Sequence, residues 1–230
     1  MSLDIIIPTL NEYQNLKILL PYLKQHISNS DTKIIVVDAQ KSTDDTAQLC
    51  RLHDIMYLKS AYNQRASQMN EGALQTTADH LIFIHADVLP PATFVPDILS
   101  ALSDKYDFGL FPYTLDSPSF MLKINSWFTN FHMLMAGGGD QCHFMTKTCY
   151  TALGGYDSSY NLMEDFDFFD RIKASEYQYT IVPSKAIVSA RKYDKYSWFR
   201  VNLVNLIVFT KYRMGVEPDR LKAFCNRWLA

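Results

Sequence analysis

The sequence predicts an α/β fold with a mainly parallel sheet flanked by helices. Three observations indicate it. Short apolar runs recur through the first part of the chain, they alternate with segments of helical periodicity, and polar residues follow them where strands would end. The 230 residues are 48% hydrophobic and 20% charged, which is typical of one globular domain and excludes a disordered or collagen-like chain.

The first half of the chain supplies four strands and their connecting helices. Leu3–Ile7 (LDIII) and Lys33–Val37 (KIIVV) are apolar runs typical of buried strands, and two shorter runs, Met56–Leu58 and His80–Ile84, follow the same pattern. Helical periodicity or N-cap residues indicate helices between and after them. These helices are expected over Glu12–His26, from Ser42–Asp45 through Leu52, over Gln64–Thr76 and near Phe94–Leu102.

The second half is less regular and richer in aromatic residues. We expect strands over Phe108–Tyr113, Cys142–Met145, Tyr179–Val182 and Ala186–Ala190. Helical segments are expected over Pro118–Met135, Met163–Ala174 and Trp198–Arg213.

Charge and cysteine patterns indicate the environment of the protein. The N-terminus lacks the features of a signal peptide, and the longest stretch without a charged residue, Ile124–Gly139, contains several polar residues, so no membrane span is expected. Four scattered cysteines without a CxxC pair favour the cytoplasm. The net charge of −2 argues against a nucleic-acid partner, whereas residues 191–230 carry nine Lys/Arg against three Asp/Glu. That end suits an anionic ligand or the inner face of a membrane.

Polar residues lie at the predicted carboxyl ends of the strands, where parallel sheets bind ligands. They are Thr9, Asn11, Glu12, Asp38, His85 and Asp87. Asp38 is placed to accept hydrogen bonds from a nucleotide base or ribose; the alternative is a cap for the next helix. His85 and Asp87 point the same way at i and i+2, which suits Mg²⁺ or Mn²⁺ beside a phosphate; the alternative is a simple turn.

Three further groups suggest chemistry. Glu164-Asp165 is either a general base for an acceptor hydroxyl or a pair of acids that complements a helix dipole. Arg191-Lys192 suits a diphosphate or is a surface pair. Asp140 and Gln141 follow a run of three glycines, which allows a close approach to a ligand. Arg65 either lines a site or is a solvated side chain.

Eight stretches run in one order along most of the chain. They are IIIPTLNE (5–12), IIVVDAQKSTDDTA (34–47), RASQMNEGA (65–73), LIFIHADVLPP (81–91), GGGDQCHFM (137–145), LGGYD (153–157), LMEDFDFFDRI (162–172) and SARKY (189–193). Together they resemble family 2 glycosyltransferases of the GT-A fold, a Rossmann-like fold with a mixed, mainly parallel sheet. They are most similar to the short soluble bacterial members of the selenodomain-associated transferase type, which carry HAD in place of DxD.

The resemblance implies an inverting transfer of a sugar from a nucleoside-diphosphate donor such as a UDP-sugar. By position, Pro8, Thr9, Asn11, Glu12 and Asp38 would hold the nucleoside, with Arg65 and His85 nearby. Asp87 would bind Mn²⁺ or Mg²⁺, and Arg191 would neutralise the leaving diphosphate. Asp165 would be the catalytic base with Glu164 beside it, and Asp140 and Gln141 would face the sugar or acceptor.

One domain is expected over residues 1–230. Its parts would be a nucleotide-binding half (1–105), an acceptor and catalytic half (106–200) and amphipathic basic helices (201–230).

The chain departs from the family pattern after its second strand. Family members usually read VDGGSxDxT or VDDGSxDxT there, whereas Ala39-Gln40-Lys41 precede Ser42 in this chain, one residue more and without glycine. Together with His85 in place of the first acid, this keeps open a nucleotide- or sugar-binding protein that has lost catalysis. A nucleotidyltransferase ranks last because PTLNEYQN has neither glycine nor a cation.

The aromatic stretch Phe120–Met135 and the basic helix Trp198–Arg213 have two interpretations. They are core elements, or they touch a lipid-phosphate acceptor or a bilayer surface. The acceptor is therefore open between a lipid-linked molecule and a saccharide, and an exposed aromatic face would also suit a homodimer.

Overall fold

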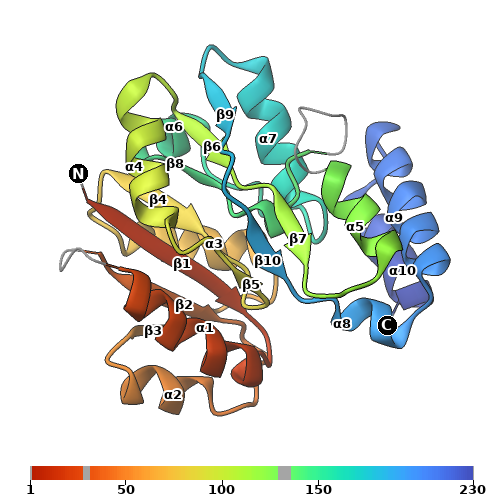
Figure 1. Ribbon diagram of the computed structural model, residues 1–230, viewed down its shortest axis with the longest axis horizontal. Helices are drawn as coiled ribbons and strands as arrows, with labels where there is room; N and C mark the ends of the chain where they lie inside the picture. Colours follow the sequence, from red (N-terminus) through yellow and green to blue (C-terminus); the bar gives the residue numbers. More distant parts are fainter. Residues whose placement is uncertain (1, 28–31, 129–135, 230) are drawn as a thin grey trace.

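A seven-stranded sheet forms the centre of the molecule (Figure 1). The computed structural model describes residues 2–27, 32–128 and 136–229. The strand order is β3-β2-β1-β4-β8-β6-β9. The bounds are β1 Leu3–Thr9, β2 Ile34–Asp38, β3 Met56–Lys59, β4 His80–Phe83, β6 Phe108–Leu110, β8 Phe144–Thr146 and β9 Tyr179–Ile181.

The pairing confirms a mainly parallel sheet. β1 pairs in parallel with β2 and β4, β2 with β3, and β6 with β9. Only β8 runs antiparallel to its neighbours, β4 and β6. The register aligns Thr9 with Asp38 and Asp38 with Lys59, so the carboxyl ends of β1, β2 and β3 meet at one edge.

Helices cover both faces of the sheet, as the alternation along β1 requires. Ile5 and Ile7 pack into one core cluster with residues of α1 and α4, whereas Ile6 packs into the other with residues of α3 and α7. Both faces of β1 are therefore buried, which explains why apolar residues follow one another from Ile5 to Pro8. The helices of the first half are α1 Tyr13–His26, α2 Thr46–Leu52, α3 Arg65–Leu74 and α4 Phe94–Asp104.

The single strand expected over Phe108–Tyr113 is wrong, because the chain changes sheets there. β6 ends at Leu110, and β7 (Tyr113–Leu115) belongs to a second sheet with β5 (Val88–Leu89) and β10 (Ala186–Val188). Pro112 lies between them and has no N–H for a ladder; its carbonyl accepts from Ala186 instead. Because β5 closely follows β4 and pairs with β10, this second sheet brings residues 186–195 near the carboxyl end of β4.

The second half contains six helices within the described residues. They are α5 Phe120–Phe128, α6 Lys147–Ala152, α7 Glu164–Ala174, α8 Arg191–Lys195, α9 Trp198–Arg213 and α10 Pro218–Leu229. α9 has the predicted bounds, whereas α6 and α8 were not predicted because one or two turns carry no readable periodicity. The helical segment expected to Met135 is described only to Phe128, and residues 129–135 lie outside the described part. α5, α9 and α10 gather at the end of the molecule opposite β3 (Figure 1).

None of the helices in the described ranges is long and apolar enough to cross a membrane.

Candidate functional site

An open cleft of about 430 Å³ lies at the carboxyl ends of β1 and β4. We call it the donor cleft. Residues from seven parts of the chain line it: the end of β1 with the residues after it, the start of α3, the segment after β4, the 3₁₀ turn Gly139–Gln141, residues 161–162 before α7, the start of α8 and α10. Its lining includes Pro8, Thr9, Glu12, Arg65, Gln68, His85, Asp87, Asp140, Arg191 and Lys222.

A second cleft of about 500 Å³ lies next to it, between the second sheet and helices α8, α9 and α10. We call it the side cleft. Tyrosines and lysines are prominent in its lining, which includes Tyr113, Lys192, Tyr193, Lys195 and Tyr196. The two clefts share Asp87, Asp140 and Arg191.

Arg191 connects the two walls of this junction. Its guanidinium donates to both carboxylate oxygens of Glu12 at 2.9 and 2.7 Å and to Asp87 Oδ2 at 3.0 Å. The side chain of Asp87 remains one quarter exposed. The hydrogen bond from Arg191 to Glu12 and the charges of both acids raise the pKa of Arg191, so the residue is a permanent cation at this position.

A second charged group consists of Arg65, Glu164 and Asp165. The side chain of His85 separates it from the junction of the two clefts. Arg65 Nε lies 3.3 Å from Glu164 Oε1, and Arg65 Nη1 lies 3.7 Å from Asp165 Oδ2. Glu164 and Asp165 begin α7 and are only 2% and 6% exposed. Burial and the Glu164 carboxylate raise the pKa of Asp165 to about 7, although His85 and Arg65 act in the opposite direction. An acid tuned to this range suits proton transfer at neutral pH.

His85 links this pair to the junction. Its Nε2 lies 3.2 Å from Arg65 Nη1, and its Nδ1 lies 3.4 Å from Asp140 Oδ1. Burial and the Arg65 charge oppose protonation of His85, but the Asp140 hydrogen bond and the Asp165 and Asp140 charges raise its pKa. Burial acts to raise the pKa of Asp140, but the hydrogen bond with His85 and nearby cations lower it. The structure therefore places an imidazole between Arg65 and Asp140, at a position where the family pattern has a carboxylate.

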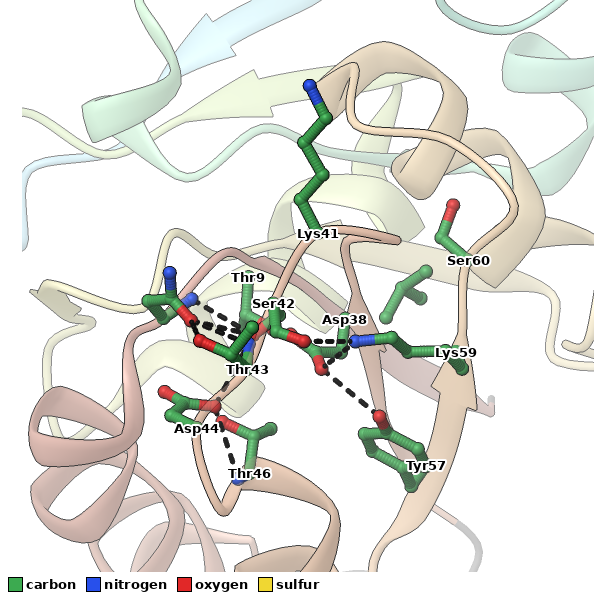
Figure 2. Close-up of polar contacts among 12 residues, drawn as sticks. Thr9, Asp38, Lys41, Ser42, Thr43, Asp44, Thr46, Tyr57, Lys59 and Ser60 are labelled. Carbon is green, nitrogen blue, oxygen red and sulfur yellow. Dashed lines mark hydrogen bonds and ion pairs between the residues drawn. The ribbon is translucent and has the colours of Figure 1, made fainter.

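The carboxylate of Asp38 already accepts three hydrogen bonds from the protein. Its Oδ1 accepts from Thr9 at 3.0 Å, and its Oδ2 accepts from Tyr57 at 3.1 Å and from Lys59 at 3.0 Å (Figure 2). Asp38 is 1% exposed and does not line the donor cleft. In this arrangement it fastens the ends of β1, β2 and β3 together, and contact with a base or ribose would require Lys59 or Tyr57 to release it.

The extra-long loop after β2 is held in place by Asn11. The Asn11 carboxamide oxygen accepts from the Thr43 N–H at 2.8 Å, and the Asn11 N–H donates to Ser42 Oγ at 3.1 Å. Lys41 points away from this cluster (Figure 2). Asn11 has a φ of +55°, and two more non-glycine residues near the site, Cys142 and Met163, have φ of +48° and +71°. Backbone in this region is strained, and such strain clusters at functional sites.

The structure gathers most of the predicted residues at the two clefts. Eight of them line the donor cleft: Pro8, Thr9, Glu12, Arg65, His85, Asp87, Asp140 and Arg191. Asn11, Asp38, Gln141, Glu164 and Asp165 do not line it. Gln141 is buried and accepts the Gly137 N–H at 2.7 Å, so it shapes the glycine run.

Sequence reasoning missed the roles of Lys59 and Lys222. Lys59 was detectable in principle, because the last residues of β2 and β3 are in register. Lys222 had no such signal, because α10 lies more than one hundred residues away in sequence from most of the other lining residues.

The donor set at the junction fits a divalent cation that arrives with a phosphate ligand. Asp87 offers one accessible carboxylate, and Mg²⁺-like ions use one or two carboxylates together with substrate phosphates and waters. Within the described residues, no group of three or more His, Cys, Asp or Glu side chains is arranged to hold an ion by itself. His85 is engaged by Arg65 and Asp140, so Asp87 is the side chain that would hold the ion.

The comparison with protein families decides the identity of the chain. The profile of Glycosyl transferase family 2 matches residues 4–150, which include β1 to β4 and β8. The chain belongs to this family. It is therefore a glycosyltransferase, as the order of its motifs predicted. A search of curated proteins finds no match.

Solved structures show the fold. TarS 1–349 of S. aureus matches 97% of this glycosyltransferase and 69% of its own chain at 15% identity and a TM-score of 0.65. The mannosyltransferase PcManGT of Pyrobaculum calidifontis matches 92% and 63% of the two chains at 15% identity and a TM-score of 0.70. Glucosyl-3-phosphoglycerate synthase of Mycobacterium tuberculosis matches 94% and 80% at 14% identity and a TM-score of 0.61. The glycosyltransferase has the GT-A fold that these proteins share.

Proposed function

We propose that this glycosyltransferase moves a sugar from a nucleoside-diphosphate sugar to a hydroxyl acceptor with inversion at the anomeric carbon. The observation that carries the proposal is the junction of the donor cleft and the side cleft at Asp87, Asp140 and Arg191. The donor cleft would hold the nucleotide sugar, and the side cleft would admit the acceptor. The bond would be made where the two meet.

Asp87 and Arg191 would handle the diphosphate. The donor cleft supports this because Asp87 is accessible and Arg191 lies 3.0 Å from it. A Mn²⁺ or Mg²⁺ ion at Asp87 would offset the charge that builds on the departing diphosphate. Crystal structures of PcManGT with GDP-Man and Mn²⁺, and of the synthase with Mn²⁺ and UDP, support a metal of this class and a nucleotide donor.

Asp165 would act as the general base. The acceptor oxygen would lose its proton to Asp165 as it forms a bond to the anomeric carbon, and the bond from that carbon to the diphosphate oxygen would break on the opposite face. The raised pKa of Asp165 and its place beside Gly139 and Arg65 support this role. Arg65 would withdraw from Asp165 to let the hydroxyl approach, and Glu164 would keep Arg65 nearby.

A binding protein of the same fold that has lost catalysis is the second candidate. Two observations favour it: His85 stands in place of an acid, and the Asp38 carboxylate is held by Thr9, Tyr57 and Lys59. The retained group of Asp87, Glu164 and Asp165 favours the enzyme.

Calorimetric titration of UDP and GDP, with and without Mn²⁺, tests the donor site. We expect one nucleotide to bind, more tightly with Mn²⁺, and the metal effect to disappear in Asp87→Ala because that variant removes the accessible carboxylate. Binding of neither nucleotide would contradict the donor assignment. Binding that is insensitive to Mn²⁺ would contradict the metal assignment alone.

A membrane-facing role is proposed for α9 and α5, which would suit a lipid-linked acceptor. Phe199, Leu203 and Leu206 recur on one face of α9 and are 73%, 59% and 52% exposed. α5 lies against α9 through the Asn125–Asn202 hydrogen bond of 3.0 Å, and its Phe120 and Trp127 are also exposed. Two exposed cations are close to it in sequence, Lys195 just before α9 and Arg200 in its first turn, and positive charge there would suit anionic lipid.

Co-sedimentation with phosphatidylglycerol vesicles at low salt checks this surface. We expect the protein to pellet, and we expect pelleting to fall in Leu203→Asp and at high salt. Pelleting with uncharged phosphatidylcholine vesicles alone would contradict the electrostatic part. No pelleting, together with a dimer by light scattering that Leu203→Asp dissociates, would assign the surface to a homodimer instead.

A further inference from the structure

Helix α10 forms one wall of the donor cleft. Leu221 is fully buried and packs with Val204 and Val208 of α9, and Asp219 accepts a hydrogen bond from Asn161. These contacts fix the rotation of the helix. They turn the neighbouring face, with Lys222, Cys225 and Asn226 at positions i, i+3 and i+4, towards the cleft that Pro8, Thr9 and Asp87 line from the other side.

Lys222 differs from the two other cations of the donor cleft. Arg65 is paired with Glu164 and Asp165, and Arg191 is paired with Glu12 and Asp87. Lys222 has no hydrogen bond or ion pair with any residue in the part of the chain that the structure describes. Lys222 is half-buried in the wall of the cleft that it lines.

A diphosphate in the donor cleft needs a positively charged donor that is not already paired, and Lys222 can supply it. Three acids line the cleft, Glu12, Asp87 and Asp140, and the two arginines are already balanced by acids in or behind it. A diphosphate adds at least two negative charges to this space. Its oxygens need donors that are not occupied, and a lysine ammonium provides three of them on a flexible stem.

We propose that Lys222 binds the diphosphate group of the donor and of the nucleoside diphosphate product. This inference rests on the proposed function for the location of the diphosphate, and it adds a residue that lies outside the family-matched residues 4–150. Lys222 acts on the side of the diphosphate opposite the carboxyl ends of β1 and β4. α10 thereby contributes charge to the site in addition to covering it.

Calorimetric titration of three probes tests the assignment: inorganic pyrophosphate, UDP or GDP, and the corresponding nucleoside without phosphate. In Lys222→Ala we expect the Kd for pyrophosphate and for the nucleotide to rise by about ten-fold or more, because a charge-assisted contact is lost. The Kd for the nucleoside should stay unchanged. Lys222→Arg should restore most of the affinity, since it keeps the charge.

Arg227→Ala is the matched control, because Arg227 is an exposed cation on the same helix that does not line the donor cleft. It should bind all three probes like the unaltered protein. Thermal unfolding of each variant reports whether α10 stays docked.

Two results would overturn the inference. One is an unchanged Kd for pyrophosphate and nucleotide in a folded Lys222→Ala protein, and the other is an equal loss for the nucleoside. If the unaltered protein binds none of the probes, both the inference and the proposed function fail. If it binds pyrophosphate through Lys222 but neither UDP nor GDP, the anion site stands and the proposed assignment of the nucleotide donor fails.

Discussion

Asp165→Asn is expected to lower kcat by on the order of 10²–10⁴-fold, the range that a general base contributes. The side chain keeps its shape but no longer accepts the proton of the acceptor hydroxyl. The Kd of the nucleotide should stay within about two-fold of its original value, because Asp165 does not line the donor cleft. Initial rates with a nucleotide sugar, together with calorimetry, separate the two effects.

The pH dependence gives Asp165 a second signature. Burial and the Glu164 carboxylate raise the pKa of Asp165 to about 7, so the base is ionised only above that pH, and kcat/KM should fall as the pH drops through about 7. The free energy of unfolding depends on pH in the opposite direction to kcat/KM. Between the unfolded pKa of about 3.9 and the folded value, the native state binds the extra proton, so this group's stabilising contribution is lost as the pH rises towards 7 and above. Asp165→Asn should therefore raise Tm relative to the unaltered protein at pH 8 and change it little at pH 5.

Asp167→Asn is the control for this variant. Asp167 lies in the same first turn of α7 but pairs with Arg171, away from both clefts. It should keep its kcat and its pH profile. Full turnover by Asp165→Asn would remove Asp165 as the base and would direct the search to Asp140, the carboxylate that both clefts share with Asp87.

Gly139→Ala is expected to lower kcat/KM by about 10²-fold or more, the scale that a displacement of about 1 Å produces at an active site. A Cβ at this position would overlap His85 Cε1 and Asp165 Oδ2. The backbone of Gly139 fits between the two side chains only because it carries no side chain. The added methyl group would push His85 from Asp140 or Asp165 from Arg65, and such overpacking costs about 1–3 kcal/mol of stability. Steady-state rates and thermal unfolding measure both effects.

Gly138→Ala controls for the loss of glycine in the same run. Among the residues that the structure describes, its Cβ would meet Phe166, at 3.4 Å, which is ordinary contact. Its activity should stay close to that of the unaltered protein. Equal losses in both variants would show that the run needs flexibility, and they would contradict a steric role specific to Gly139.

The fold was predictable where the sequence pattern was long or buried on both faces. β1 and β2 are recognisable in the sequence as apolar runs, and the bounds of α9 follow from its sixteen-residue pattern. The five residues of α8 and the two residues of β5 carry too little periodicity to be read. The exchange between sheets at Pro112 was missed because β6 and β7 are continuous in hydrophobicity and separate only in their partners.

The residues of the candidate site were also predictable from the sequence only in part. Thr9, Glu12, His85 and Asp87 follow neighbouring strands, so the geometry of a parallel sheet already implies that they meet. The pairing of Asp38 with Lys59 was not foreseen from the residues alone, although it makes the Asp38 carboxylate a fastening between strands. The short, soluble bacterial subfamily stays a prediction, as do the subdivision of the domain and the cytoplasmic location.

The order of the chain's motifs indicated the family from the sequence alone. The mainly parallel sheet and the acids near its edge were also predictable, because local hydrophobic periodicity and strand-end polarity need no partner to be recognised. The tertiary structure alone decided which charges are already paired and which remain free. Arg191 pairs with Glu12, and Arg65 pairs with Glu164 and Asp165. Lys222 lines the donor cleft and has no ion pair with the residues that the structure describes. Ion pairing depends on distances of a few ångströms between residues far apart in the chain, and only the tertiary packing of the elements that carry them, such as α10 against α9, sets those distances.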